Sequence, residues 1–230
     1  MRHVDRLPRG SEKARLVREM FDRIAPRYDL VNRVMTFVMD TGWRRKSIAA
    51  LRLGPGDLVL DVACGTGDFC RELEEGGHRV VGIDFSMGML QVARTGAPLI
   101  QGDALRLPLR DASVDAATCG FALRNVTDTG DLFDELARVV RPGGRIALLE
   151  VSQPKSRMLR TGHHVYFHKV VPFIGGVLSD KDAYGYLPRS TAYLPPTEDL
   201  LARLRTAGFA DAEAQHMGLG AVQLLTGTRA

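Results

Sequence analysis

Short apolar runs alternate with amphipathic stretches along the middle of the chain. Four runs are long enough for buried strands and too short for helices; they cover residues 58–63, 80–84, 99–102 and 114–121. Helical spacing appears near 86–94 and 130–140, and a glycine-proline stop at 141–144 leads into a further strand at 145–150. This alternation predicts an α/β fold with a mainly parallel sheet, helices on both faces, and ligands bound outside the strands' carboxyl ends.

A glycine turn follows the first predicted strand. Asp61 lies within that strand, Gly65 and Gly67 come directly after it, and a helix is expected to begin near Asp68. The two glycines allow the backbone to turn sharply and to approach a ligand closely. A second carboxylate, Asp84, ends the next strand. Together, the two glycines and the two carboxylates predict a binding site for a nucleoside-containing cofactor.

The residues of the turn favour one cofactor over another. A dinucleotide fold places a third glycine where this chain has Cys70, and the pyrophosphate would lie next to the charge of Asp61. The same carboxylate suits a cationic amino group, as in S-adenosylmethionine, which also carries a sulfonium. Asp84 lies where a carboxylate can accept hydrogen bonds from both ribose hydroxyls. The sequence therefore predicts S-adenosylmethionine rather than a dinucleotide.

Further cofactor contacts are expected at other strand ends and in the N-terminal region. Asp103 and Ala104 follow the third strand, where a carboxylate and a backbone amide can read an adenine edge. Arg27 and Tyr28 precede a helical stretch from which they can reach the cofactor's carboxylate, although Tyr28 can equally be an ordinary packed aromatic residue.

Two segments carry a resemblance to a known family: Met20-Phe21-Asp22-Arg23-Ile24-Ala25-Pro26-Arg27-Tyr28-Asp29 and Phe121-Ala122-Leu123-Arg124-Asn125-Val126. Over nearly its whole length the chain resembles the menaquinone/ubiquinone C-methyltransferases. The resemblance implies a class I methyltransferase fold, with a Rossmann-like, mostly parallel seven-stranded sheet and helical lid elements. It also implies S-adenosylmethionine as methyl donor and C-methylation of a prenylated quinol, with demethylmenaquinol as the first expectation. A prenylated benzoquinol of ubiquinone biosynthesis and another small molecule are the alternatives.

By the same resemblance Thr66, Asp84, Asp103 and Ala104 match cofactor-contacting positions. Gly120 also falls at such a position, but many members carry serine there, so one hydrogen bond worth about 1 kcal/mol is in question. Cys64 replaces the first glycine of the family's Gly-Gly-Thr-Gly, a change that we expect to be tolerated.

The chemistry of carbon methylation selects the catalytic candidates. A phenol with a pKa of about 10 stays protonated at neutral pH, so a cation or a base must assist the loss of its proton. Arg124, after the fourth strand, is the candidate cation, and Asn125 the candidate hydrogen-bonding partner of a quinol oxygen; the alternative for Arg124 is an ion pair with an acid such as Asp128. His164 and His168 would share one face of a helix and are candidate bases, but paired surface histidines are common.

Length and composition fit one globular domain: 230 residues with 45% hydrophobic content. We expect a helical N-terminal lid at 1–52, a cofactor-binding core at 53–152, a lid insertion at 153–190, and a C-terminal helix with closing strands at 191–230. No signal peptide or membrane-spanning run is apparent, and the three cysteines show no metal-ligand spacing. A cytoplasmic location without structural metal or disulfides follows; oligomeric state stays open.

Positive charge is concentrated outside the predicted core. Residues 1–52 carry thirteen Lys and Arg against six Asp and Glu, and residues 153–190 carry six against two. Both regions interleave these charges with apolar residues, which suits peripheral association with an anionic membrane face; a solvated helix face is the alternative. No nucleic-acid-binding motif is present, so nucleic acid is not an expected partner. A cofactor-binding protein without activity is the remaining non-enzymatic alternative.

Overall fold

A computed structural model of the protein describes residues 8–154 and 156–230, with the side chains of 157, 163–165, 167, 168, 181 and 182 left outside the description. Its centre is a seven-stranded sheet of order β3-β2-β1-β4-β5-β7-β6. The strands are β1 (Leu58–Val62), β2 (Arg79–Asp84), β3 (Leu99–Gln101), β4 (Val114–Gly120), β5 (Val140–Val151), β6 (Glu213–Met217) and β7 (Val222–Thr228).

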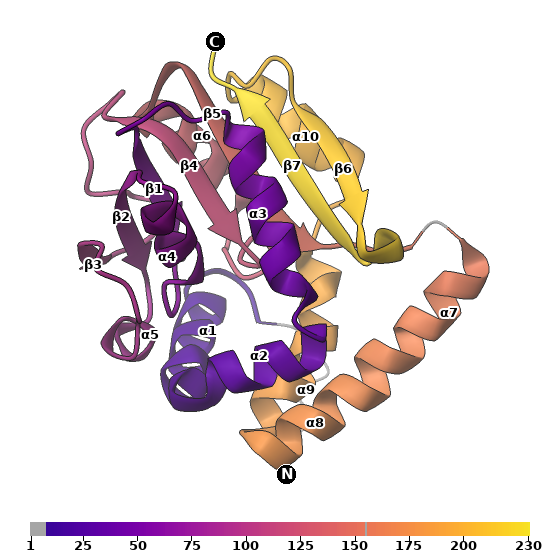
Figure 1. The fold of residues 1–230 in the computed structure, drawn as a ribbon. Coiled ribbons are helices and arrows are strands. Elements are labelled where there is room, and N and C mark those ends of the chain that lie inside the picture. Colours follow the sequence, from indigo (N-terminus) through magenta and orange to yellow (C-terminus); the bar gives the residue numbers. More distant parts are fainter. Residues whose placement is uncertain (1–7, 155) are drawn as a thin grey trace.

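The first five strands are parallel, and only β7 runs antiparallel to its neighbours β5 and β6. All five strands predicted from apolar runs are present. The expected mostly parallel sheet is therefore confirmed, with the carboxyl ends of β1 to β5 along one edge (Figure 1).

Strand β5 begins earlier than predicted. Val114 pairs with Val140, but the next pair joins Ala116 to Arg145, so residues 141–144 bulge out of one continuous strand. Gly143 provides the positive φ of 77° that the bulge requires. The glycine-proline stop does end the preceding helix, α6 (Thr129–Val139), whose N-terminus is capped by the Asp128 side chain.

Helices cover both faces of the sheet. On one face lie α3 (Met39–Leu51) and α4 (Asp68–Glu75); on the other lie α6 and α10 (Thr197–Thr206) (Figure 1). Because side chains alternate along a strand, Leu60 and Val62 join the buried cluster beneath α6, whereas Val59 joins the cluster beneath α4. Asp61, two positions after Val59, therefore faces α4 as Val59 does.

A separate helical layer lies beyond the carboxyl ends of the parallel strands (Figure 1). It consists of α1 (Gly10–Ile24), the 3-10 turn Ala25–Arg27, α2 (Tyr28–Thr36), α7 (Arg157–Val165), a π-helical turn Tyr166–Val170, α8 (Val171–Leu178) and α9 (Lys181–Ser190). This layer has its own small core, which includes Ile24, Val31, Val171 and Tyr184. Helix α3 packs on the sheet and belongs to the layer on that face, and only its first turns reach the strand ends.

Three smaller elements complete the fold: the short helix α5 (Met87–Gln91) after β2, and 3-10 turns at Thr191–Tyr193 and Gly218–Gly220. Lys13 of α1 fastens the helical layer to the core, because its Nζ donates to the Val126 carbonyl at 2.6 Å. The same ammonium lies 3.9 Å from the centre of the Tyr193 ring, and burial lowers its pKa to about 8. Among the helices of the described residues, none is both long and apolar enough to cross a bilayer.

Candidate active site

The glycine turn after β1 forms the wall of two adjoining cavities, and its two glycines serve different purposes. Gly65 has φ 55° and faces open space, since no atom lies within 4 Å of the position that a Cβ would take. Gly67 has φ 83° and precedes α4, where a Cβ would come 2.9 Å from Thr95 Cγ2. Gly65 borders both cavities, whereas Gly67 lines neither and shapes the turn.

The smaller cavity, of about 130 Å³, has the composition of a nucleoside site. Asp84, Asp103 and Ala104 line it together with apolar groups such as Ile83 and Met89. The Asp84 carboxylate accepts hydrogen bonds from the Gly65 and Ser86 backbone N–H groups, each at 2.8 Å. Carboxylate oxygens accept up to about four hydrogen bonds in total, so Asp84 retains capacity for two ribose hydroxyls. Burial raises its pKa, which makes added donors favourable.

The larger cavity, of about 490 Å³, lies between the strand ends and the helical layer. Its lining combines polar groups with many apolar and aromatic side chains. Among the predicted site residues it is lined by Tyr28, Asp61, Gly65, Thr66, Gly120, Arg124 and Asn125. The structure thus brings together every predicted cofactor and acceptor residue whose side chain is described, except Gly67 and Arg27, around these two cavities.

Asp61 is the buried carboxylate of the larger cavity, with only 1% of its surface exposed. Thr118 Oγ1 donates to it at 2.8 Å and Cys70 Sγ at 3.4 Å, so both hydrogen-bond donors are neutral. Desolvation raises its pKa to about 7, against the smaller effect of these hydrogen bonds. A cation bound in the cavity would provide the charge partner that Asp61 lacks.

Arg44 of α3 was not predicted from the sequence. Its guanidinium also lines the larger cavity and contacts Asp40 at 2.8 Å, Asp68 at 3.2 Å and Glu72 at 3.3 Å. The spacing of Asp40 and Arg44, four residues apart, was the available signal, but it is equally typical of any solvated helical pair. Arg44 is a candidate to hold a ligand carboxylate.

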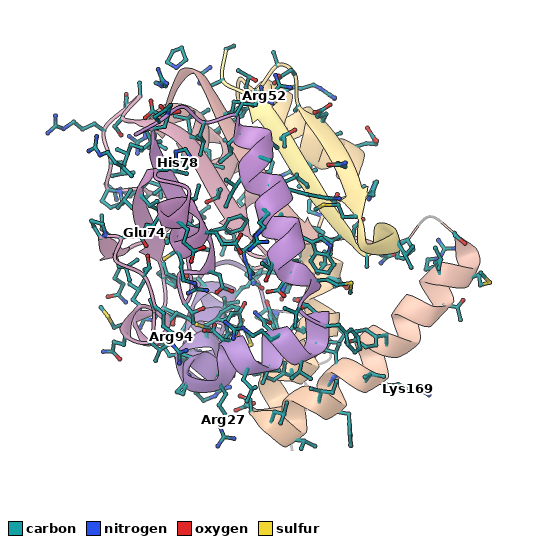
Figure 2. All side chains as sticks on the ribbon, in the orientation of Figure 1. Arg27, Arg52, Glu74, His78, Arg94 and Lys169 are labelled. Atoms are coloured by element: carbon teal, nitrogen blue, oxygen red, sulfur yellow. The ribbon has the colours of Figure 1, made fainter. Side chains whose placement is uncertain are left out.

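Tyr28 and Thr66 lie close to this end of the cavity. Tyr28 begins α2, lines both cavities, and packs edge-on against Phe21 with the ring centres 6.0 Å apart. Thr66 Oγ1 donates to Asp29 at 2.6 Å, which ties the glycine turn to α2. Arg27 instead donates to the Leu178 carbonyl at 3.0 Å and lines neither cavity; Figure 2 shows it at the outside of the helical layer.

Gly120, at the end of β4, lines both cavities. A Cβ added there would come 2.9 Å from Cε2 of the buried Phe69. The aromatic ring therefore occupies the space in which a serine side chain would begin. Glycine in place of the family's serine at position 120 is therefore consistent with the position of the Phe69 ring.

Arg124 is 5% exposed and forms an ion pair with Glu150, which is fully buried. Its Nη1 also donates to the Phe121 carbonyl at 2.7 Å, and its Nε donates to Ser190 Oγ at 3.2 Å. The acid is thus Glu150, not Asp128, which caps α6. Glu150 was missed although, like Asp61 and Asp84, it is an acid near the carboxyl end of an apolar strand.

Asn125 follows Arg124 and lines both cavities. Its Nδ2 donates to the Phe121 carbonyl at 3.4 Å, while its Oδ1 is buried without a hydrogen-bond partner. Buried polar atoms are nearly always paired in folded proteins, so an unpaired one facing a cavity indicates a ligand position.

The two candidate bases lie in the part of the helical layer that runs from α7 to α8. His164 belongs to α7, and His168 belongs to the π-helical turn that follows. The four-residue spacing that predicted a shared face applies to an α-helix, and a π-helical turn changes that periodicity. Both side chains lie outside the described residues, so their role stays a prediction.

A family model and several known proteins match this chain over most of its length. The model of the ubiE/COQ5 methyltransferase family matches residues 9–229. The chain is 42% identical to the demethylmenaquinone methyltransferase of Roseiflexus castenholzii, covering 97% of each chain. It is 37% identical to the ubiquinone/menaquinone biosynthesis C-methyltransferase UbiE of Geobacter sulfurreducens, over 96% of this chain and 91% of that one.

The fold is also shared with solved structures. An S-adenosylmethionine-dependent methyltransferase of Thermotoga maritima superposes with a TM-score of 0.64 at 22% identity, over 93% of this chain and 100% of that chain. This likeness shows the class I methyltransferase fold. The glycine turn, the buried carboxylate of Asp61 and the acids at the strand ends fit S-adenosylmethionine as methyl donor. The chain is a methyltransferase that belongs to the ubiE/COQ5 methyltransferase family.

Proposed function

We propose that this enzyme methylates a ring carbon of a prenylated quinol, converting demethylmenaquinol to menaquinol. The observation that carries the proposal is the unpaired, buried Oδ1 of Asn125, a residue that lines a large and mainly apolar cavity beside Arg124. A quinol hydroxyl would satisfy that oxygen, and its ring would lie among the apolar side chains. The names of the Roseiflexus and Geobacter relatives support the same acceptor class.

Cofactor binding is divided between the two cavities. Asp84, Asp103 and Ala104 would bind the nucleoside, while Asp61 would bind the amino group and Arg44, Tyr28 and Thr66 the carboxylate end. Gly65 and Gly120 lie between the two groups and allow close approach of the ligand to the backbone. When bound, S-adenosylmethionine supplies an electrophilic methyl group on a sulfonium.

The acceptor side follows from the electron demand of the reaction. Loss of the phenolic proton to a base, for which His164 and His168 are the candidates, raises the electron density of the ring. The ring carbon then forms a bond to the methyl group, the electron pair of the broken carbon–sulfur bond stays with sulfur, and loss of the ring proton restores aromaticity. Arg124 and Asn125 orient the two ring oxygens, and the helical layer excludes water from the electrophile.

The prenyl tail and the membrane belong to the same proposal. Exposed apolar residues border the larger cavity at Phe37, Met158 and Leu219, with 68%, 79% and 78% exposure. Helix α8 also exposes Phe173 and Val177, and Lys169 lies on the π-helical turn that precedes this helix (Figure 2). Apolar side chains among cations suit an anionic lipid surface, through which a tail can reach the cavity. The free thiols of the three cysteines suit the cytoplasmic face.

Methyl transfer tests the acceptor directly. Purified protein in detergent micelles is given labelled S-adenosylmethionine and demethylmenaquinone, with and without a reductant. We expect label in the quinone only when it is reduced, because only the quinol ring is electron-rich. The Asp84→Ala variant, which lacks the ribose contact, is the inactive control. Labelling of a benzoquinol or of a polar small molecule instead would refute the demethylmenaquinol assignment.

Cofactor affinity should depend on the charge of Asp61. Because its pKa is raised to about 7 by burial, the carboxyl is mostly protonated below that pH in the free protein. Affinity for S-adenosylmethionine should therefore rise about tenfold from pH 5.5 to 7. The α-amino group of the ligand titrates above this pH interval and so does not contribute to the change. Titration calorimetry checks this, and Asp61→Asn should bind more weakly without this pH dependence. An unchanged pH dependence in that variant would assign the effect to another group.

Replacement of Arg124 separates its structural role from its proposed role in turnover. Arg124→Ala leaves the charge of Glu150 buried and unpaired, so we expect a loss of about 3–5 kcal/mol in the free energy of unfolding. Arg124→Lys retains a cation but loses the planar guanidinium, and should lower kcat by about 10- to 1000-fold with cofactor affinity unchanged. Urea unfolding and steady-state kinetics measure both. Full activity of the lysine variant would exclude a role for the guanidinium.

Membrane association can be tested by sedimentation with vesicles that contain anionic phospholipid. Replacement of Phe173 and Val177 by serine should reduce the bound fraction at least several-fold, because it removes exposed apolar area from α8. Met87→Ser on α5 is the matched control, since Met87 is also exposed but lies outside the two basic segments. Equal losses in both proteins would argue against a membrane-facing role for α8.

A further inference from the structure

A second residue that lines the larger cavity carries a buried polar atom without a partner. It is Tyr186 of α9, whose hydroxyl oxygen is unpaired and which was not predicted from the sequence. Buried tyrosine hydroxyls usually find a hydrogen-bond partner, and leaving one unpaired costs free energy. With Asn125 Oδ1, the cavity therefore presents two buried polar atoms that are available to a ligand.

The register of α9 places Tyr186 on the side of Arg124. Tyr186 and Ser190 are four residues apart, so they share one face of the helix. Ser190 Oγ accepts the hydrogen bond from Arg124 Nε, and both α9 residues line the cavity. The contact that holds Arg124 thus also fixes the face of α9 that carries the tyrosine.

The hydroxyl of Tyr186 is a donor at neutral pH. Burial, with a further contribution from Tyr193, raises its pKa to about 12, although the charge of Arg124 acts in the opposite direction. A phenol that stays protonated can donate to an oxygen on which negative charge develops, whereas Asn125 Oδ1 can only accept.

We propose that the Tyr186 hydroxyl is a substrate-orienting group that donates a hydrogen bond to one ring oxygen of the acceptor, while Asn125 Oδ1 accepts from the hydroxyl across the ring. This inference rests on the proposed function, because a 1,4-quinol carries two oxygens at opposite ends of an apolar ring. The bond from Tyr186 strengthens as its ring oxygen becomes a phenolate, so it stabilises the form of the substrate that accepts the methyl group.

The chain supplies a matched control in Tyr184, two residues earlier on α9. Its hydroxyl is also buried without a partner, but its ring lies in the core of the helical layer against Gly175 and is not among the residues lining the cavity. Tyr184→Phe and Tyr186→Phe each remove one oxygen and keep the ring. They differ in whether the residue lines the cavity.

The test compares wild type and the two variants with S-adenosylmethionine and demethylmenaquinol in detergent micelles. Tyr186→Phe should lower kcat about 10- to 100-fold, with cofactor affinity by calorimetry and the unfolding midpoint close to wild type. The pH at which kcat reaches half of its maximum should rise by about one unit, because the phenolate loses a hydrogen bond. Tyr184→Phe should change neither quantity.

The outcomes separate the two proposals. A wild-type enzyme that does not label demethylmenaquinol refutes the proposed function, whatever the variants do. Normal labelling by wild type with an unchanged kcat and pH profile in Tyr186→Phe refutes only the role of Tyr186. Equal losses in both tyrosine variants would overturn the inference as well, because they would assign the effect to the packing of α9.

Discussion

The buried ion pair between Arg124 and Glu150 is the interaction on which the wall of the larger cavity beside Asn125 depends. Glu150 is fully buried at the end of β5, where it also accepts hydrogen bonds from the backbone N–H groups of Arg124 at 3.1 Å and Val151 at 2.7 Å. Burying two charges costs several kcal/mol per ion and is offset only by close pairing with further hydrogen bonds. Since Arg124 also bonds to Phe121 and Ser190, one side chain connects β4, β5 and α9.

The opposite end of the larger cavity has a different balance of charge. Asp40, Asp68 and Glu72 all contact the guanidinium of Arg44, while Arg71 also pairs with Asp68 and Arg45 with Glu72; Asp61 lies nearby with neutral donors only. These four carboxylates still exceed the three guanidinium groups, which favours a ligand that brings more positive than negative charge and disfavours a phosphate. The ammonium and sulfonium of S-adenosylmethionine meet that requirement, while Arg44 offers a position for its one carboxylate. The cation site inferred from Asp61 alone is thus part of a larger acidic environment.

Local patterns were sufficient for most of the parallel strands and for the glycine turn with its neighbouring acids. Apolar runs, glycines and strand-ending acids are contiguous in sequence, so β1 to β4, Asp61, Gly65 and Asp84 could be placed without knowledge of the tertiary structure. Arg44, Glu150 and Tyr186 gain their significance from partners that are distant in sequence. Glu72 lies 28 residues from Arg44, Arg124 lies 26 residues from Glu150, and the charge of Arg124 also acts on Tyr186. No local spacing encodes those contacts. The π-helical turn at Tyr166–Val170 likewise has no simple sequence signal, which is why the register of the histidines could not be predicted.

The strained backbone at the end of β4 joins the two halves of the site. Phe121 has φ 56°, an unfavourable value for a bulky residue, and its N–H donates to the Leu149 carbonyl at 2.6 Å. This turn directs residues 121–125 across the mouth of the sheet, so that Phe121 and Asn125 line both cavities, as do Tyr28, Gly65 and Gly120 on the facing walls. In the proposed arrangement these shared residues lie beside the cofactor, where it passes from one cavity to the other. Because a side chain at Gly120 would meet the ring of Phe69, glycine at this position leaves the backbone open to the close approach of a ligand.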